Sequence, residues 1–146
     1  MVEGIRNLIA FAILLGSLIF FHELGHFLAA IKLGVKIKEF GLGFPPKIMT
    51  IGTWKNTKFT LNLIPIGGFV RPEGEDDPTI EGGLASSKPI HRLAILSAGS
   101  GVNLLLSIII LTIGFASGWP DKVSIVNVSP ESPASYIGLQ SGDLIV

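Results

Sequence analysis

Two histidines and a glutamate stand close together in the pattern His22-Glu23-Leu24-Gly25-His26. Residues that lie four apart on a helix project from one face, so both imidazoles could bind the same Zn²⁺ ion. Glu23 would lie about 100° further round the helix, close enough to take a proton from a water molecule on the metal without becoming a ligand. Zinc lowers the pKa of such a water towards ~7, and a carboxylate completes its activation for attack on an amide carbonyl. The pattern predicts metal-dependent hydrolysis of amide bonds.

The surroundings of this motif separate a metal site from a chance match. The motif lies inside the apolar block Leu8–Ile31, whose first part, residues 8–21, contains no charged side chain. As a helix the block spans roughly 36 Å, enough to cross a hydrocarbon core of about 30 Å. An ionisable side chain at such depth costs about 2.5–3.5 kcal/mol, so solvation does not explain three polar residues there. A buried polar packing cluster is the alternative to a zinc site.

The composition also indicates a membrane protein. The chain has 146 residues, of which 48% are hydrophobic and only 15% charged, whereas soluble domains have about 25% charged residues. A second block, Leu93–Trp119, is uncharged and ends in a tryptophan suited to a membrane interface. The net charge of zero argues against nucleic-acid binding, and the lack of cysteine excludes thiol nucleophiles and cysteine zinc sites. A cleaved signal peptide is the alternative for the first block, but Glu3 beside Arg6 gives no positive excess.

Basic residues predict the orientation of the two blocks. Nine lie between them: Lys32, Lys36, Lys38, Lys47, Lys55, Lys58, Arg71, Lys88 and Arg92. Only Arg6 and Lys122 lie outside this segment. By the positive-inside rule, residues 32–92 are cytoplasmic, whereas the N-terminus and the region after Trp119 face outward. We therefore expect a multi-pass protein of a cell membrane, with the bacterial cytoplasmic membrane favoured.

The segments outside the blocks predict small β elements. Apolar and polar residues alternate through Lys58–Ile64, and residues 47–51 could pair with them through a turn near 55–57. Gly67, Gly68 and Pro72 interrupt that pattern, and residues 74–78 form a polar loop. After Trp119, a strand is expected around Val123 and Ile125, and a short helix over 134–139. Roughly 25 residues cannot bury a core alone, so we expect the truncated start of a domain.

Five segments in order resemble the site-2 proteases, zinc metalloproteases that cleave within the membrane, of the bacterial regulator-of-sigma-E-protease type. They are residues 22–27, 34–44, 63–70, 92–103 and 129–143, the last resembling the opening of a PDZ domain. The resemblance implies Zn²⁺ as cofactor, His22 and His26 as metal ligands, and Glu23 as the general base. It also implies single-span membrane proteins as substrates, for example of the anti-sigma-factor type, and the lipid bilayer as surroundings.

The same resemblance implies that the hairpin holds substrate as an added strand. Peptide bonds in a helix are shielded, so an unwound substrate needs backbone partners at the site. We expect substrate contacts at Asn62, Pro65, Gly67 and Gly68. The PDZ-like region would restrict access to the site.

The sequence departs from the family pattern at two places. Ser100 stands where the family usually has proline after Ala-Gly, and this should matter little for the chemistry. The family's third zinc ligand is an aspartate in a later membrane segment, which we expect downstream of Val146. A catalytic zinc normally has three protein ligands and a water, and none of Asp76, Asp77, Asp121 and Asp143 is an obvious substitute. We therefore expect an N-terminal fragment that is not an active protease by itself.

The expected architecture is an α-helical integral membrane protein with two transmembrane helices, a small cytoplasmic membrane-associated β-hairpin and the truncated start of a PDZ-like α+β domain. The expected parts are residues 1–92, with the first helix and the hairpin, residues 93–119, with the second helix, and residues 120–146. The expected function is zinc-dependent intramembrane endopeptidase. Two alternatives stay open: a membrane-bound zinc protease whose site faces the cytoplasm, and an inactive scaffold that binds partners through its PDZ region.

Overall fold

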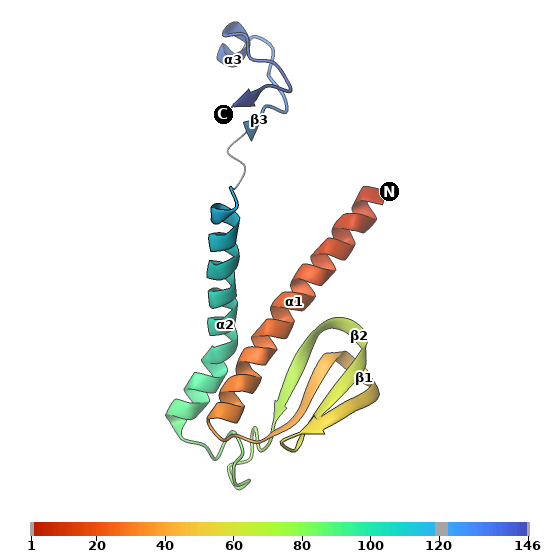
Figure 1. The fold of residues 1–146 in the computed structure, drawn as a ribbon, viewed down its shortest axis with the longest axis vertical. Coiled ribbons are helices and arrows are strands. Elements are labelled where there is room, and N and C mark those ends of the chain that lie inside the picture. Colours follow the sequence, from red (N-terminus) through yellow and green to blue (C-terminus); the bar gives the residue numbers. More distant parts are fainter. Residues whose placement is uncertain (1, 119–122, 146) are drawn as a thin grey trace. The chain divides into compact units, whose positions relative to one another are not determined.

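The computed structural model describes residues 2–118 and 123–145. Its elements, in chain order, are α1 (Val2–Lys32), β1 (Ile37–Trp54), β2 (Thr57–Pro72), α2 (Pro89–Ala116), β3 (Val123–Ser124), α3 (Pro133–Tyr136) and β4 (Leu144–Ile145) (Figure 1). They form two compact units, one up to residue 106 and one from residue 107. The first unit contains the predicted metal motif.

Two long apolar helices are present, as the two hydrophobic blocks predicted. α1 has 31 residues and α2 has 28, and both are long and apolar enough to cross a membrane. Large apolar side chains on α1 point outward, and Leu14, for example, is 70% exposed. Each helix starts earlier than predicted: α1 at Val2 instead of Leu8, and α2 at Pro89 instead of Leu93. Pro89 suits a first helical position, where no N–H is needed. Trp119 lies outside the described residues.

The two strands fold into one small antiparallel sheet. Phe40, in the first half of β1, lies opposite both Phe59 and Val70 of β2. The first half of β1 is therefore central, and β2 residues 68–71 form one edge of the described sheet. The strands are joined by Lys55 and Asn56, which have positive φ angles of 48° and 65°, as a two-residue hairpin turn requires.

The predicted hairpin is confirmed, but its strands are longer than predicted. Met49 pairs with Leu61 and Thr50 with Thr60, as the alternating pattern indicated. The prediction that Gly67, Gly68 and Pro72 interrupt the strand was wrong, because β2 continues to Pro72. A Cβ on Gly68 would lie 2.6 Å from the Gly41 carbonyl oxygen. Glycine here permits a close approach of two strands, and proline is tolerated at the strand end.

The buried core joins the end of α1 to the sheet and to the start of α2. Its members are Phe27, Ala30, Val35, Ile37, Phe40, Leu84 and Ile95. The Phe27 ring lies edge-on to Phe40 at 5.2 Å and to Phe59 at 5.7 Å between centroids. Such aromatic pairs each contribute about 0.5–1.5 kcal/mol beyond their burial. This cluster fixes the sheet against the last turns of α1.

The second unit contains the end of α2 and three short elements. Val123 pairs with Ile145 and Ser124 with Leu144. Ser132 caps α3, because its hydroxyl accepts a hydrogen bond from the Ser135 N–H. The helix ends at Tyr136, earlier than predicted, and Gly138 follows in a left-handed conformation at φ +84°. The PDZ-like assignment and the domain boundaries stay predictions.

Candidate metal and catalytic site

The two motif histidines converge on one point. The Nε2 atoms of His22 and His26 lie 3.1 Å apart, and their rings are nearly perpendicular at 87°. Two nitrogens that bind one tetrahedral zinc ion at 2.0–2.1 Å lie about 3.3 Å apart. The pair therefore fits a shared Zn²⁺ ion with only a small adjustment.

The surroundings of His26 favour the tautomer that binds a metal. Its Nδ1 lies 2.7 Å from the backbone oxygen of Ile95, on α2. A carbonyl only accepts hydrogen bonds, so Nδ1 must donate its proton there. In the neutral ring this leaves the lone pair on Nε2, and a carbonyl partner of this kind commonly orients metal-binding histidines.

Asn103, on α2, contacts the other motif histidine, His22. Its Nδ2 lies 3.4 Å from the Nδ1 atom of His22. The structure shows the contact between helices. An amide can present either its nitrogen or its oxygen, so a flipped Asn103 would accept the Nδ1 proton of His22.

Glycines let the two helices touch beside the histidines. A Cβ on Gly99 would lie 2.6 Å from His26 Nε2 and 2.8 Å from His22 Nε2. On the opposite helix, a Cβ on Gly25 would lie 2.7 Å from the Ala98 carbonyl oxygen. Real side chains do not approach this closely. Small residues at both positions bring the α2 backbone against the imidazole pair, as in other close helix contacts in membranes.

Glu23 shares a cavity with His26. The cavity has a volume of about 230 Å³, and its walls include Glu23, His26, Ile37, Val70 and the loop residue Glu75. One carboxylate oxygen of Glu23, Oε2, accepts a 3.0 Å hydrogen bond from the N–H of Val70. Val70 belongs to the edge segment of β2, so the sheet holds the proposed base beside the proposed ligand.

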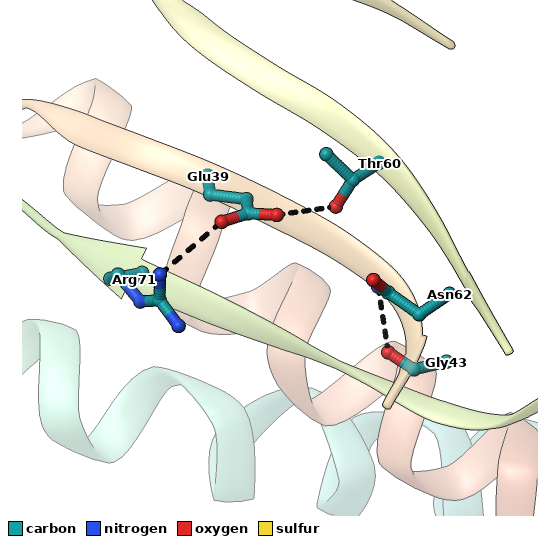
Figure 2. Close-up of polar contacts among 5 residues, drawn as sticks. All are labelled: Glu39, Gly43, Thr60, Asn62 and Arg71. Atoms are coloured by element: carbon teal, nitrogen blue, oxygen red, sulfur yellow. Dashed lines mark hydrogen bonds and ion pairs between the residues drawn. The ribbon is translucent and has the colours of Figure 1, made fainter. Parts of the chain in front are cut away.

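The four predicted substrate-binding residues lie in different surroundings. Asn62 is 3% exposed, and its Nδ2 donates to the carbonyls of Leu42 at 3.3 Å and Gly43 at 3.1 Å. Figure 2 shows the bond to Gly43, which ties β2 to β1. Asn62 therefore acts within the sheet.

Pro65 and Gly67 lie beside α1 instead. Both line a hollow of about 540 Å³ against the apolar face of α1. Gly67 has φ +71°, and a Cβ there would lie 2.5 Å from Cγ2 of Ile19. Gly68 is paired with Leu42 inside the sheet. These glycines let β2 run close along the helix that contains the histidines.

The described residues do not provide a third metal ligand beside His22 and His26. Among residues 2–118 and 123–145, no group of three metal-binding side chains is present. Asp77 is engaged locally: its Oδ1 accepts bonds from the hydroxyl of Thr79 at 2.6 Å and from the N–H of Thr79 at 2.9 Å. Both bonds hold the pKa of Asp77 below its ordinary value. Asp143 belongs to the second unit, and Asp121 lies outside the described residues.

Three features of the site escaped the sequence analysis. They are the Ile95 carbonyl, the Val70 N–H and the close approach of Gly99. Backbone groups leave no trace in residue type, so the first two could not be found. Gly99 could have been suspected, because it lies in a run of small residues on an apolar helix, opposite the glycine of the motif.

Comparison with known proteins places the chain in a family. The model of peptidase family M50 matches residues 10–141, which is nearly the whole chain. The chain belongs to peptidase family M50. This is the family of site-2 proteases, so the resemblance drawn from the sequence motifs is confirmed.

Individual relatives of this M50 chain are named as zinc enzymes. A Clostridium perfringens relative, whose name assigns it to the zinc metalloproteases, is 36% identical over 138 residues, 92% of this chain and 41% of its own. The zinc metalloprotease RasP of Geobacillus kaustophilus is 47% identical over 81 residues, 56% of this chain and 19% of its own. The regulator of sigma-W protease RasP of Bacillus subtilis is 48% identical over 77 residues, 53% of this chain and 18% of its own. The predicted cofactor, Zn²⁺, agrees with these names.

The match covers only part of the length of each relative. The chain spans about two fifths of the length of the curated relatives that it matches over most of its own length.

Proposed function

We propose that this chain forms part of a zinc-dependent intramembrane endopeptidase that hydrolyses peptide bonds of single-span membrane proteins. The observation that supports it best is the arrangement of three side chains on α1. Two imidazole nitrogens converge at 3.1 Å, and Glu23 lines the same cavity as one of those imidazoles. These are the groups that an HExxH metalloprotease needs from one helix.

Each residue has a distinct role in this proposal. His22 and His26 would hold the metal, and the Ile95 carbonyl keeps the His26 ring in the required tautomer. A zinc ion held there would supply Lewis-acid polarisation of a carbonyl and a lowered pKa for an attacking water. Glu23 accepts the proton of that water and then donates it to the leaving amine. The Val70 N–H fixes Oε2 of Glu23 and so orients the carboxylate.

The sheet edge beside Glu23 is the proposed substrate platform. An extended substrate segment could add to β2 along residues 65–69, next to Val70, whose own N–H is engaged by Glu23, and strand addition would supply backbone partners for unwound peptide. In this proposal, Pro65, Gly67 and Gly68 shape that edge for substrate. Asn62 acts indirectly, because its bonds to Leu42 and Gly43 keep β1 and β2 in register.

The depth of the motif supports cleavage within the membrane. His22 lies ten residues before the end of α1 at Lys32, or about 15 Å along the axis. We propose that residues 32–92 are cytoplasmic and that residues 120–146, with their PDZ-like sequence, lie outside and restrict access. The third zinc ligand would lie downstream of Val146. Anti-sigma factors are the proposed substrate type, in line with the name of the Bacillus subtilis relative.

One observation favours a second candidate. Glu75 and Leu84, from the loop between β2 and α2, line the same cavity as Glu23. A site open towards this loop would suit a membrane-bound zinc protease that cuts soluble chains from the cytoplasm. The two candidates differ in substrate, so cleavage of a single-span protein and of an unfolded soluble protein should be compared in one reconstituted preparation.

The zinc content of the purified protein and its histidine variants tests the proposal. In the complete protein, His22→Ala and His26→Ala should each lose the zinc ion and the proteolytic activity, because a two-coordinate remnant holds zinc weakly. His91→Ala is the matched control, since His91 is a third histidine that does not line the cavity of Glu23 and His26, and this variant should keep both. Unchanged zinc in either motif variant would overturn the assignment.

A further inference from the structure

Five basic side chains meet at one end of the sheet. Lys36, Lys38, Lys55, Lys58 and Arg71 line a hollow of about 450 Å³, here called the basic hollow. They come from four places in the chain: the start of β1 with the residue before it, the turn between the strands, the start of β2 and the end of β2. The register explains the meeting, because Glu39 of β1 lies opposite both Lys58 and Arg71.

The basic hollow has an excess of positive charge. Two acidic side chains, Glu39 and Glu73, also line it. Glu39 is already engaged, since it lies 3.4 Å from Nη1 of Arg71 and accepts a 2.6 Å bond from the Thr60 hydroxyl (Figure 2). Lys36 donates to a neutral group, the carbonyl of Glu81, at 3.0 Å. Five positive charges thus face two negative ones, which suits an anionic ligand.

Trp54 places the basic hollow at a defined depth along α1. The Trp54 ring lies 6.3 Å from the ring of Phe27, and Lys55 Nζ lies 4.9 Å from the Trp54 centroid. Phe27 stands five residues before the end of α1, or about 7.5 Å along its axis. If α1 crosses the membrane, this is the headgroup level, where half-exposed tryptophans and nearby lysines are typical. Trp54 is 50% exposed.

We propose that the basic hollow binds the phosphate group of anionic membrane lipids. Its charge matches a phosphodiester, and its depth matches the lipid headgroups. The inference requires α1 to span a membrane, but it does not depend on proteolysis. It has a consequence for the site, because Arg71 in the hollow directly follows Val70, whose N–H holds Glu23. Lipid bound at the hollow would steady the strand segment that orients the proposed base.

Binding can be measured on the complete protein in detergent micelles by native mass spectrometry. The probes are short-chain phosphatidylglycerol, phosphatidylcholine with the same chains, and inorganic phosphate. The double variant Lys38→Gln/Lys58→Gln should bind phosphatidylglycerol roughly 30-fold more weakly, at about fivefold for each lysine near a membrane surface. Glu73→Gln should bind it more tightly.

The matched control is Lys47→Gln/Lys88→Gln, which removes two exposed lysines of the same connecting segment that do not line the hollow. This control should keep its affinity for phosphatidylglycerol. Equal loss in the two double variants would overturn the proposal, as would phosphatidylcholine binding as tightly as phosphatidylglycerol. Inorganic phosphate binding as tightly as phosphatidylglycerol would overturn the lipid assignment and identify a site for free phosphate.

Discussion

The backbone N–H of Val70 donates a 3.0 Å hydrogen bond to Oε2 of Glu23. A single contact thus connects the edge of the sheet to the proposed general base on α1, although the residues are 47 apart in sequence. Because a backbone group makes the bond, its strength is independent of the side chain at position 70. The contact gives the sheet two roles in our proposal, to offer an edge to substrate and to orient the base.

Glu23→Gln should keep the zinc ion and lose proteolysis. The amide oxygen of glutamine can still accept the bond from Val70, so the local structure should survive, but the amide cannot take a proton at neutral pH. Loss of a general base typically costs 10²–10⁴-fold in rate. The measurement is cleavage of a reconstituted single-span substrate, together with metal analysis of the purified variant.

The matched control for this prediction is Glu81→Gln. It makes the same chemical change in the loop between β2 and α2, where Glu81 is exposed and its backbone carbonyl accepts a hydrogen bond from Lys36. The control should cleave normally. Near-normal cleavage by Glu23→Gln as well would show that another group acts as the base.

Gly99→Ala should disrupt zinc binding although it replaces neither of the proposed ligands. The new methyl group would meet both imidazoles at 2.6–2.8 Å and force the rings or α2 to shift. Disturbing the groups around metal ligands commonly costs about 10–100-fold in affinity, and we expect a loss in this range for the complete protein. Zinc affinity can be measured by competition with a chelator.

Gly101→Ala makes the same change two residues along α2. A Cβ at Gly101 meets no atom within 4 Å among the described residues, so this control should keep its zinc affinity. If both alanine variants bound zinc as the parent does, the close contact between Gly99 and the histidines would be wrong.

The features predicted from the sequence are those that residue type and spacing encode. The four-residue spacing of His22 and His26 fixes them to one helix face, and their Nε2 atoms do converge. The uncharged blocks predicted two long helices, and alternation over 58–64 predicted a strand. Each of these follows from local chemistry and the period of one element.

The features missed depend on contacts between distant segments. Residues 37–44 form the central part of the sheet, but Gly41, Gly43 and the two prolines that follow resemble turn residues. Glycine is required here for close packing, since a Cβ on Gly41 would overlap the ring of Phe69. The continuation of β2 through Gly67 and Gly68 has the same cause. Sequence alone does not distinguish a glycine that bends the chain from one that admits a neighbour.

Residues 32–92 should lie on the opposite side of the membrane from the region after α2. The prediction rests on the nine basic residues between the two apolar blocks, from Lys32 to Arg92, and on the positive-inside rule. The chain contains no cysteine, so single cysteines at Lys55 and at Ser129 can be labelled without background. An impermeant thiol reagent added to intact cells should label the Ser129→Cys variant and leave Lys55→Cys unlabelled until the membrane is opened. Equal labelling of the two in intact cells would refute this topology.

The loop between β2 and α2 should lose a local restraint at low pH. The pKa of Asp77 lies below its ordinary value of 3.8, first because the Thr79 hydroxyl donates to its carboxylate and second because the Thr79 N–H does. A carboxyl group whose pKa is lowered by folding stabilises the folded loop above its unfolded pKa, and this stabilisation is lost as the pH falls through the lowered value. At neutral pH the restraint should therefore be complete.

Thr79→Val should raise the pKa of Asp77 towards 3.8, because it removes the hydroxyl donor and leaves the N–H donor in place. The carboxyl carbon of Asp77 can be followed by NMR through an acid titration of the protein in micelles. Ser86→Ala is the matched control: its hydroxyl belongs to the same loop but donates to the carbonyls of Ile80 and Gly83. The control should leave the titration of Asp77 unchanged. An identical midpoint for Asp77 in the parent and in Thr79→Val would show that the hydroxyl does not hold the carboxylate in solution.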